Sequence, residues 1–385
     1  MREICVVTSS RADYGLLKPL IKRLKDEADV NLSVVVTGMH LCPEFGNTFR
    51  EIEEDGNEIK RKIDIQVHSD SPSGMSKTMG MALVCFSEYF EANQFDLLIV
   101  LGDRYEIAAV CCAAVNQRIP IAHIHGGETT VGVIDEAYRH AITKMSAVHF
   151  TSCEVYRKRV IQLGEHPDSV FNVGALGVEN VLNIQMLTCE QLEQSIDFPI
   201  TDKIYGLVTF HPATLEDNAE AQLRELFSAL DAFPNMQFII TKSNSDAGGR
   251  LINTLWDNYV INRDNSYLTE SLGAIRYLSA MKHSAVVIGN SSSGVIEAPA
   301  LQVPSVNIGY RQKGRVMAES VISCMPLTTA IEAAINKAIT TEFRQQAAKT
   351  SNPYGNGEAS KHIANILREQ MKSKIDLKKR FYDVT

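Results

Sequence analysis

Hydrophobic residues in the first half of the chain fall in short runs separated by longer amphipathic segments. Runs rich in β-branched residues predict strands at Ile4–Thr8, Leu32–Thr37, Ile63–Val67, Leu97–Gly102, Pro120–His123 and Val148–Thr151. Between these runs the apolar residues recur at helical spacing, which predicts helices such as Tyr14–Ala28, Ser76–Asn93 and Tyr105–Asn116. Near-continuous apolar strands alternating with helices indicate a parallel sheet covered on both faces.

The second half repeats this pattern. Strands are predicted at Gly206–Phe210, Gln237–Thr241, Tyr259–Asn262, Ala285–Gly289 and Ser305–Ile308, and helices at Ala219–Ala232 and Leu268–Met281. The predicted fold class is therefore α/β, with two Rossmann-like doubly wound domains facing across a cleft. In such sheets ligands bind beyond the carboxyl ends of the strands, so motifs at strand ends carry the most information about function.

The domain organisation follows from the length of 385 residues, which is more than twice that of a typical domain. A Gly-rich turn at 174–177 and a polar stretch after it place the boundary near residues 175–200. We expect domains at 1–180 and 181–357. The remaining segment, 358–385, contains a predicted helix at Glu358–Lys372 and a charged tail, and it could pack back on the first domain.

Composition narrows the functional classes. The formal charge of −8 argues against a broad surface for nucleic acid or an anionic membrane. The eight cysteines are scattered without C-x-x-C pairs, which favours buried free thiols over a zinc site. The first strand begins near the N-terminus, and no apolar run reaches the roughly 18 residues needed to span a bilayer. A cytoplasmic protein is expected.

The first strand leads into Thr8-Ser9-Ser10-Arg11-Ala12-Asp13-Tyr14-Gly15. Backbone N–H groups at the start of the next helix could face an anion, and Arg11 could contact phosphate with its planar guanidinium. Alternatively, Asp13 only caps the helix and Arg11 is solvated. The segment is not G-x-G-x-x-G, so it gives no support to dinucleotide binding.

Candidate acid/base residues follow the later strands of the first half. Asp103 comes directly after an apolar strand and is either a helix cap or a catalytic carboxylate. The segment His123-Ile124-His125-Gly126-Gly127-Glu128 follows the next strand, and its glycines permit close approach of backbone to ligand. Asp135 and Arg139 share one face of the helix after it. Carboxylates and histidines at strand ends suit acid/base chemistry, whereas their spacing matches no zinc pattern.

The second half carries motifs suited to phosphate. Phe210-His211-Pro212 ends its first strand, and Gly289-Asn290-Ser291-Ser292-Ser293-Gly294-Val295-Ile296-Glu297 joins a strand to a short helix. Exposed amides and three hydroxyls at a helix N-terminus form a phosphate cradle, and Glu297 could accept both ribose hydroxyls. Beyond the next strand lie cations that could neutralise a diphosphate: Arg311, Lys313 and Arg315.

Together these motifs resemble the hydrolysing UDP-N-acetylglucosamine 2-epimerases of bacterial sialic acid biosynthesis, which are related in fold to the GT-B glycosyltransferases. The resemblance covers about four-fifths of the chain. It rests on the order and spacing of SRADYG (10–15), TGMHL (37–41), LGDRYE (101–106), HIHGGE (123–128), DEAYRHAITKMS (135–146), FHP (210–212), GNSSSGVIEAP (289–299) and NIGYRQKGR (307–315).

The resemblance implies that a base removes the C2 proton of the sugar while UDP leaves C1, giving a glycal. Water then adds at C1, C2 is reprotonated on the other face, and free N-acetylmannosamine is released. Neither a cofactor nor a metal is implied. The implied catalytic residues are Asp103, Asp135 or its neighbour Glu136, and His211, and the implied substrate contacts are Arg11, Arg104, Arg139, Ser291, Ser292, Glu297, Arg311 and Arg315.

The chain departs from the family pattern at one point. Some members have a glutamate where this chain has His125, and one residue more separates that point from Asp135 than in those members. Either His125 or Glu128 therefore takes the acid/base role. The resemblance also implies a homodimer or homotetramer and a UDP-sugar as the only partner, with no nucleic acid and no membrane.

The sequence is also compatible with four alternatives. The chain could be a non-hydrolysing 2-epimerase that keeps UDP on its product. It could act on UDP-2,4-diacetamido-2,4,6-trideoxyglucose of the legionaminic acid pathway by the same chemistry. A GT-B glycosyltransferase would require an acceptor sugar, and a UDP-sugar sensor would bind without turnover.

Overall fold

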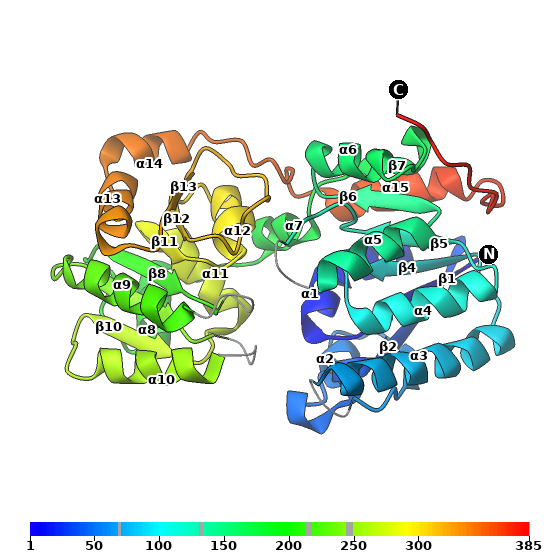
Figure 1. The fold of residues 1–385 in the computed structure, drawn as a ribbon, viewed down its shortest axis with the longest axis horizontal. Coiled ribbons are helices and arrows are strands. Elements are labelled where there is room, and N and C mark those ends of the chain that lie inside the picture. Colours follow the sequence, from blue (N-terminus) through cyan, green and yellow to red (C-terminus); the bar gives the residue numbers. More distant parts are fainter. Residues whose placement is uncertain (68–70, 131–133, 213–217, 244–248, 385) are drawn as a thin grey trace. The chain divides into compact units, whose positions relative to one another are not determined.

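The computed structural model describes residues 1–67, 71–130, 134–212, 218–243 and 249–384. The chain divides into two compact units (Figure 1). Unit 1 comprises Met1–Glu128, Ile134–Asn180 and Tyr354–Thr385, and unit 2 comprises Thr129–Val133 and Val181–Pro353. Each unit is built around one parallel β-sheet.

Unit 1 has the strand order β3-β2-β1-β4-β5-β6-β7, and every neighbouring pair is parallel. Its strands are β1 (Arg2–Thr8), β2 (Val30–Thr37), β3 (Ile59–Ile63), β4 (Leu97–Leu101), β5 (Ile121–Ile124), β6 (Val148–Thr151) and β7 (Val170–Asn172). Its helices are α1 (Arg11–Lys25), α2 (Phe49–Glu54), α3 (Pro72–Ala92), α4 (Tyr105–Asn116), α5 (Asp135–Met145), α6 (Glu154–Gln162) and α15 (Ala359–Gln370). Helix α7 (Leu176–Asn183) contains the boundary to unit 2.

Unit 2 has the strand order β10-β9-β8-β11-β12-β13, again parallel throughout. Its strands are β8 (Tyr205–Thr209), β9 (Gln237–Thr241), β10 (Ser266–Thr269), β11 (Val286–Gly289), β12 (Ser305–Ile308) and β13 (Val321–Cys324). Its helices are α8 (Cys189–Ile196), α9 (Ala219–Asp231), α10 (Gly249–Val260), α11 (Gly273–His283), α12 (Ser293–Ala300), α13 (Thr328–Ala338) and α14 (Thr341–Ala347).

The strand orders define a switch point in each unit. In unit 1, successive strands of the chain are added in one direction from β1 and in the opposite direction from its neighbour β4. In unit 2, the same reversal occurs between β8 and β11. At a switch point the loops after the two central strands diverge to opposite faces of the sheet, which leaves a crevice for a ligand. Each unit therefore has one favoured place for a binding site.

Helices cover both faces of each sheet (Figure 1). In β1, Ile4 and Val6 pack with α1 and α15 on one face, whereas Cys5 and Val7 pack with α3 and α4 on the other. In unit 2, α9, α10 and α13 cover one face, and α8, α11 and α12 cover the other. This double burial explains why the strands have near-continuous apolar sequences. The prediction of two doubly wound α/β domains is confirmed at the level of the fold class.

Some predicted elements are wrong. Residues Tyr259–Asn262, predicted as a strand, form the end of α10 and the turn after it. Tyr259 lies on the buried face of that helix, where its ring stacks on Phe227 at a centroid distance of 4.1 Å. Residues 268 and 269 belong to β10, so the helix predicted from Leu268 begins only at Gly273, and β3 ends at Ile63, where a strand was predicted to begin. Short aromatic-rich runs have the same composition in a buried helix and in a strand.

The C-terminal segment packs within unit 1. The carboxylate of Glu179 accepts hydrogen bonds from the Ser360 backbone N–H (2.6 Å) and hydroxyl (2.5 Å) at the start of α15. The same serine hydroxyl accepts a hydrogen bond from Arg23 Nε of α1 at 2.7 Å. Beyond the helix, Lys379 Nζ lies 2.6 Å from the buried carboxylate of Glu165. The chain end is thus part of the unit 1 structure.

All eight cysteines are free thiols, but the prediction that they are buried is only partly right, since Cys112 is exposed. Each helix in the described ranges is too short or too polar to cross a membrane.

Candidate active site

A single buried arginine connects three segments at the switch point of unit 1. Arg139, on α5, forms an ion pair with the carboxylate of Asp103 directly after β4. Its other terminal nitrogen donates hydrogen bonds to Glu136 Oε2 at 2.5 Å and to the Glu128 carbonyl at 3.0 Å. The arginine therefore positions the loop after β4, the loop after β5 and the first turn of α5 together.

Asp135 begins α5 and is half-buried. Burial raises the pKa of its carboxyl group, and the negative charge of Asp103 raises it further, against the opposing effect of Arg104 and Arg139. A raised pKa favours the protonated form of a carboxyl group, so Asp135 is suited to holding a proton.

The loop after β5 holds His123 and His125 in different surroundings. His123 is fully buried, with Nε2 at 2.7 Å from the Gly102 carbonyl and Nδ1 at 3.1 Å from Thr143 Oγ1. Burial lowers its pKa to about 3, so its imidazole is neutral and joins β5 to the loop that carries Asp103. A side chain at Gly126 would lie only 3.0 Å from these polar atoms.

His125 has a positive φ of 66°, which side chains other than glycine adopt uncommonly. Its backbone N–H donates to the Phe150 carbonyl at 2.8 Å, and its Nδ1 lies 3.8 Å from Glu128 Oε1. Glu128 Oε1 in turn accepts a hydrogen bond from the buried hydroxyl of Ser152 at 2.7 Å. His125 and Glu128 are thus neighbours, with the carboxylate oriented by a serine.

Arg104 pairs with the buried carboxylate of Glu106, and its guanidinium also contacts Met39 Sδ at 3.4 Å. Asp13 lies near this arginine and accepts a hydrogen bond from Ser9 Oγ at 2.9 Å. Burial raises the pKa of the Asp13 carboxyl group, although the positive charge of Arg104 opposes the shift. Ser10 caps the helix, because its side chain accepts a hydrogen bond from the Asp13 N–H. The Asp13 carboxyl group is therefore not the helix cap.

Arg11 differs from the other predicted contacts of unit 1. It is exposed at the first position of α1, and within the described ranges its guanidinium makes no hydrogen bond or ion pair. The structure therefore brings together Asp103, Asp135, Arg139, His125, Glu128 and Arg104 but leaves Arg11 outside their network.

The switch point of unit 2 is built around Asn290, which follows β11. Its side-chain Oδ1 accepts from the His211 backbone N–H at 2.7 Å, and its Nδ2 donates to the His211 carbonyl at 2.8 Å. The backbones after β8 and β11 approach closely here, because a Cβ atom at Gly289 would lie 1.9 Å from the Thr209 carbonyl oxygen. Gly289 has φ of +136°, so glycine is required at this position.

The predicted cation Arg311 also belongs to this arrangement. Its Nη1 donates to the Asn290 carbonyl at 3.1 Å, and Gln312 Nε2 donates to the same oxygen at 2.9 Å. Burial and the charge of Arg311 together lower the pKa of His211 to about 4. His211 is consequently neutral near pH 7. Arg315 lies four residues further on in the same turn and is half-exposed.

Ser291 and the N-cap residue Ser292 directly precede α12, and Glu297 lies just over one turn into the helix. Burial raises the pKa of Glu297, although a hydrogen bond with Ser293 opposes this. Tyr277 of α11 lies near this carboxylate. Burial raises the pKa of Tyr277, and the Glu297 charge adds to the shift.

Sequence reasoning missed several of these residues. Asn290 stood inside a recognised motif, so its position directly after a central strand was a usable signal. Glu106 and Gln312 likewise lie inside recognised motifs, whereas Ser152, Ser243 and Tyr277 had no comparable signal, because their partners are distant in the chain.

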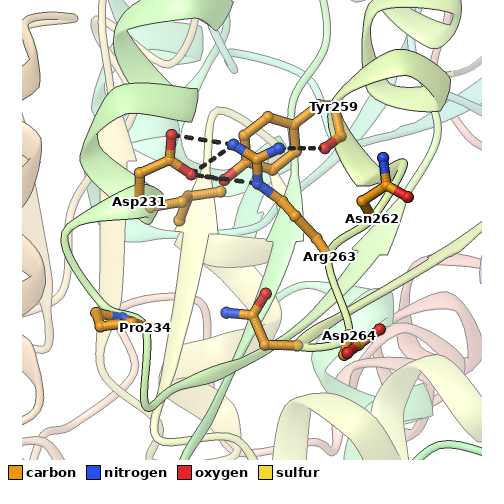
Figure 2. Close-up of a pocket in the computed structure, with 8 residues that line it drawn as sticks. Asp231, Pro234, Tyr259, Asn262, Arg263 and Asp264 are labelled. Atoms are coloured by element: carbon orange, nitrogen blue, oxygen red, sulfur yellow. Dashed lines mark hydrogen bonds and ion pairs between the residues drawn. The ribbon is translucent and has the colours of Figure 1, made fainter.

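A pocket of about 350 Å³ at the opposite end of the unit 2 sheet is not part of this site. It lies next to residues 262–265, before β10, and Figure 2 shows the Arg263 side chain paired with Asp231 at its edge. Arg263 binds both carboxylate oxygens of Asp231 and packs 3.9 Å from the Tyr259 ring centroid. These internal contacts satisfy the guanidinium, so the pocket offers little to a ligand. No group of three or more His, Cys, Asp or Glu in the described residues is arranged to hold a metal ion.

Two Rossmann-like α/β units, with acid/base groups at the switch point of one and a Ser-rich helix N-terminus at that of the other, are typical of nucleotide-sugar enzymes with a GT-B-like fold. The profile of the UDP-N-acetylglucosamine 2-epimerase family matches residues 22–368. The chain belongs to this family and is an enzyme of this type.

Relatives agree with this assignment. The chain is 41% identical to polysialic acid biosynthesis protein P7 of Escherichia coli, covering 100% of this chain and 98% of that protein. It is 39% identical to the GDP/UDP-N,N'-diacetylbacillosamine 2-epimerase (hydrolyzing) of Campylobacter jejuni, with 89% of each covered. The crystal structure of UDP-GlcNAc 2-epimerase from Neisseria meningitidis bound to UDP-GlcNAc has the same fold, with a TM-score of 0.75, 20% identity, and coverage of 95% of this chain and 100% of that one.

Proposed function

We propose that the protein is a hydrolysing 2-epimerase that converts UDP-N-acetylglucosamine to N-acetylmannosamine and UDP, the first step of sialic acid synthesis. The observation that carries the proposal is the arrangement around Arg139. This arginine holds Asp103 and the loop of His125 and Glu128 together at the carboxyl ends of β4 and β5. The name of the Campylobacter jejuni relative supports the hydrolysing reaction, and that of the Escherichia coli relative supports a role in the synthesis of a sialic acid polymer.

In the first step a base takes the proton from C2, and the C1–O bond to UDP breaks with its electron pair going to the phosphate oxygen. The new double bond between C1 and C2 gives a glycal. We assign this proton transfer to Asp103, whose carboxylate is held by Arg139. The electrostatic coupling between Asp103 and Asp135 supports a role for both on one face of the sugar.

In the second step water adds its oxygen at C1, C2 receives a proton on the opposite face, and the second water proton goes to a base. We assign the proton transfer on this second face of the sugar to His125, which Glu128 orients. The 3.8 Å approach of Nδ1 to the carboxylate supports this assignment, because a carboxylate partner stabilises an imidazolium. The Ser152 hydroxyl holds Glu128 in turn.

Unit 2 binds the nucleotide in this proposal. The Ser291 and Ser292 hydroxyls and the amides at the start of α12 contact phosphate, and Glu297 contacts the ribose hydroxyls. Arg311, Arg315 and neutral His211 stabilise the charge that develops on the leaving diphosphate. Residues 1–180 thus form the sugar side, and residues 181–357 the UDP side. Arg11 and Arg104 are further candidate substrate contacts.

A second substrate has a specific observation in its favour. The Campylobacter jejuni relative is nearly as similar to this chain as the Escherichia coli protein, at 39% against 41%, and its name specifies N,N'-diacetylbacillosamine. The same proton transfers at C2 would act on that sugar, which differs at C4 and C6. The two substrates therefore need to be compared directly.

The test is a side-by-side assay with UDP-N-acetylglucosamine and its 6-deoxy-4-acetamido analogue in deuterium oxide. We expect free UDP, N-acetylmannosamine and deuterium at C2. A higher kcat/KM for the analogue would reassign the substrate. An epimerised sugar still attached to UDP would establish a non-hydrolysing enzyme, and a product with unexchanged C2 hydrogen would exclude elimination.

We further propose that the enzyme works in the cytoplasm as a homodimer or homotetramer. The eight free thiols support a reducing compartment. Light scattering coupled to size-exclusion chromatography measures the assembly, and cell fractionation measures the compartment.

A further inference from the structure

The imidazole of His211 is held from one side by a residue that no functional motif includes. Its Nδ1 lies 3.1 Å from Ser243 Oγ, just after β9. Both backbone groups of His211 are bound by Asn290, so the main chain of the histidine is also fixed. Within the described residues no hydrogen bond reaches His211 Nε2, and this nitrogen remains for a ligand.

Ser243 is itself held in place from another element. Asn253, on α10, accepts from the Ser243 backbone N–H through Oδ1 at 2.8 Å and donates through Nδ2 to the Ser243 carbonyl at 3.1 Å. Asn253 thus forms two hydrogen bonds with the backbone of Ser243, just as Asn290 does with the backbone of His211. The chain of contacts Asn253–Ser243–His211–Asn290 therefore joins the ends of β8, β9 and β11 to α10.

The hydrogen bond between His211 Nδ1 and the Ser243 hydroxyl can run in either direction, depending on the tautomer of the ring. If the serine hydroxyl donates to Nδ1, the neutral ring carries its proton on Nε2, where it can donate to an anionic oxygen. If Nδ1–H donates to the serine, Nε2 has a lone pair that would repel a phosphate oxygen. Burial and Arg311 lower the pKa of His211 to about 4, so protonating both nitrogens near pH 7 is unfavourable. Only the first form suits a diphosphate.

We propose that Ser243 and Asn253 are positioning residues that fix His211 in the tautomer with its proton on Nε2 and aim this N–H at the diphosphate of the substrate. The inference rests on the proposed function for the identity of the ligand, but the tautomer is a property of the free protein. Ser243 acts as the donor to Nδ1, and Asn253 keeps the serine at the required distance. No proton transfer from His211 is needed, because the N–H only donates a hydrogen bond.

The first test is nitrogen NMR of the full-length protein labelled with ¹⁵N-histidine, with the His211 signals assigned by their loss in His211→Asn. We expect a neutral ring protonated on Nε2 at pH 7, and a shift of the Nε2–H signal on adding UDP. A neutral ring protonated on Nδ1 would overturn the proposal. Because UDP alone is the probe, this result does not depend on turnover of any sugar.

The second test compares Ser243→Ala with Ser243→Thr, which keeps the hydroxyl. We expect Ser243→Ala to lower kcat about tenfold or more and to weaken UDP binding by a smaller factor, and Ser243→Thr to recover most of both losses. Asn253→Ala should act in the same direction. Ser228→Ala, an exposed serine of α9, is the matched control. Wild-type kcat in Ser243→Ala would overturn the positioning role, whereas absence of turnover in the wild type would instead remove the proposed function.

Discussion

The side chain of Asn290 bonds with both backbone groups of His211, at 2.7 Å to the N–H and 2.8 Å to the carbonyl. The amide thereby replaces a peptide group of a neighbouring strand at the point where β8 and β11 diverge. The backbone carbonyl of Asn290 accepts hydrogen bonds from the side chains of Arg311 and Gln312. Asn290 thus holds two residues that were each predicted to contact the diphosphate, His211 through its side chain and Arg311 through its backbone carbonyl.

The substitution Asn290→Asp tests this relationship. The carboxylate can still accept from the His211 N–H, but its second oxygen then faces the His211 carbonyl and repels it. We expect UDP to bind at least about tenfold more weakly, and unit 2 to lose about 1–3 kcal/mol of stability. Calorimetric titration and urea unfolding measure the two effects. Asn365→Asp, at an exposed position of α15, should change neither.

The ion pair between Asp103 and Arg139 leads to a second prediction. Asp103→Asn preserves the shape of the side chain but cannot accept the C2 proton, so kcat should fall by about 10²- to 10⁴-fold. Binding of UDP, which we assign to unit 2, should stay within about twofold of the wild type. Steady-state kinetics and calorimetric titration measure these quantities, with Asp168→Asn at an exposed position as the control. Normal turnover in Asp103→Asn would remove this residue from the catalytic set.

The roles of His125 and Glu128 can be separated by what their variants release. Asparagine tolerates the positive φ of residue 125, so His125→Asn should keep the backbone. If His125 serves the second proton transfer, this variant should still eliminate UDP and release the glycal. Glu128→Gln, which keeps the bond with Ser152, should lose less activity and form the same final product. Mass spectrometry of the products distinguishes these outcomes.

The opposite outcome is equally informative. If Glu128→Gln releases the glycal and His125→Asn does not, the carboxylate is the acid/base group and His125 only supports it. Asp103→Asn provides the comparison, because it should release neither glycal nor sugar.

The buried cluster around Glu165 gives a pH prediction. Burial alone would raise the pKa of Glu165, but bonds from His149, Lys144 and Lys379 outweigh it and lower the pKa from 4.5 to about 2. A carboxyl group with a lowered pKa stabilises the fold above its unfolded pKa, and this contribution is lost as the pH falls from about 4.5 to about 2. The contribution near pH 7 is about 3 kcal/mol.

Urea unfolding between pH 7 and pH 2 tests this expectation. The difference in unfolding free energy between the wild type and Glu165→Gln should be largest near pH 7 and should shrink below about pH 4.5. Glu369→Gln, on the exposed side of α15, should show no such difference. A constant difference across the range would mean that the ion pairs of Glu165 do not stabilise the folded state.

The sequence by itself determined the α/β class and most of the strands, because strands buried on both faces must be apolar along their whole length. It also placed Asp103, His125, His211 and Ser291 at strand ends, since a motif directly after a strand has its position set by local chain direction. The strand prediction failed for Tyr259, where a buried helix face has the same composition as a strand.

Only the tertiary structure decided which of these groups act on one another. Asp135 and Arg139 share a helix face, yet the arginine also pairs with Asp103, 36 residues away. Likewise, Ser243 meets His211 across 32 residues, and Tyr277 meets Glu297 from another helix. The strand order brings such residues together, and it depends on how whole elements pack. The short-range periodicity of a sequence carries no information about that packing.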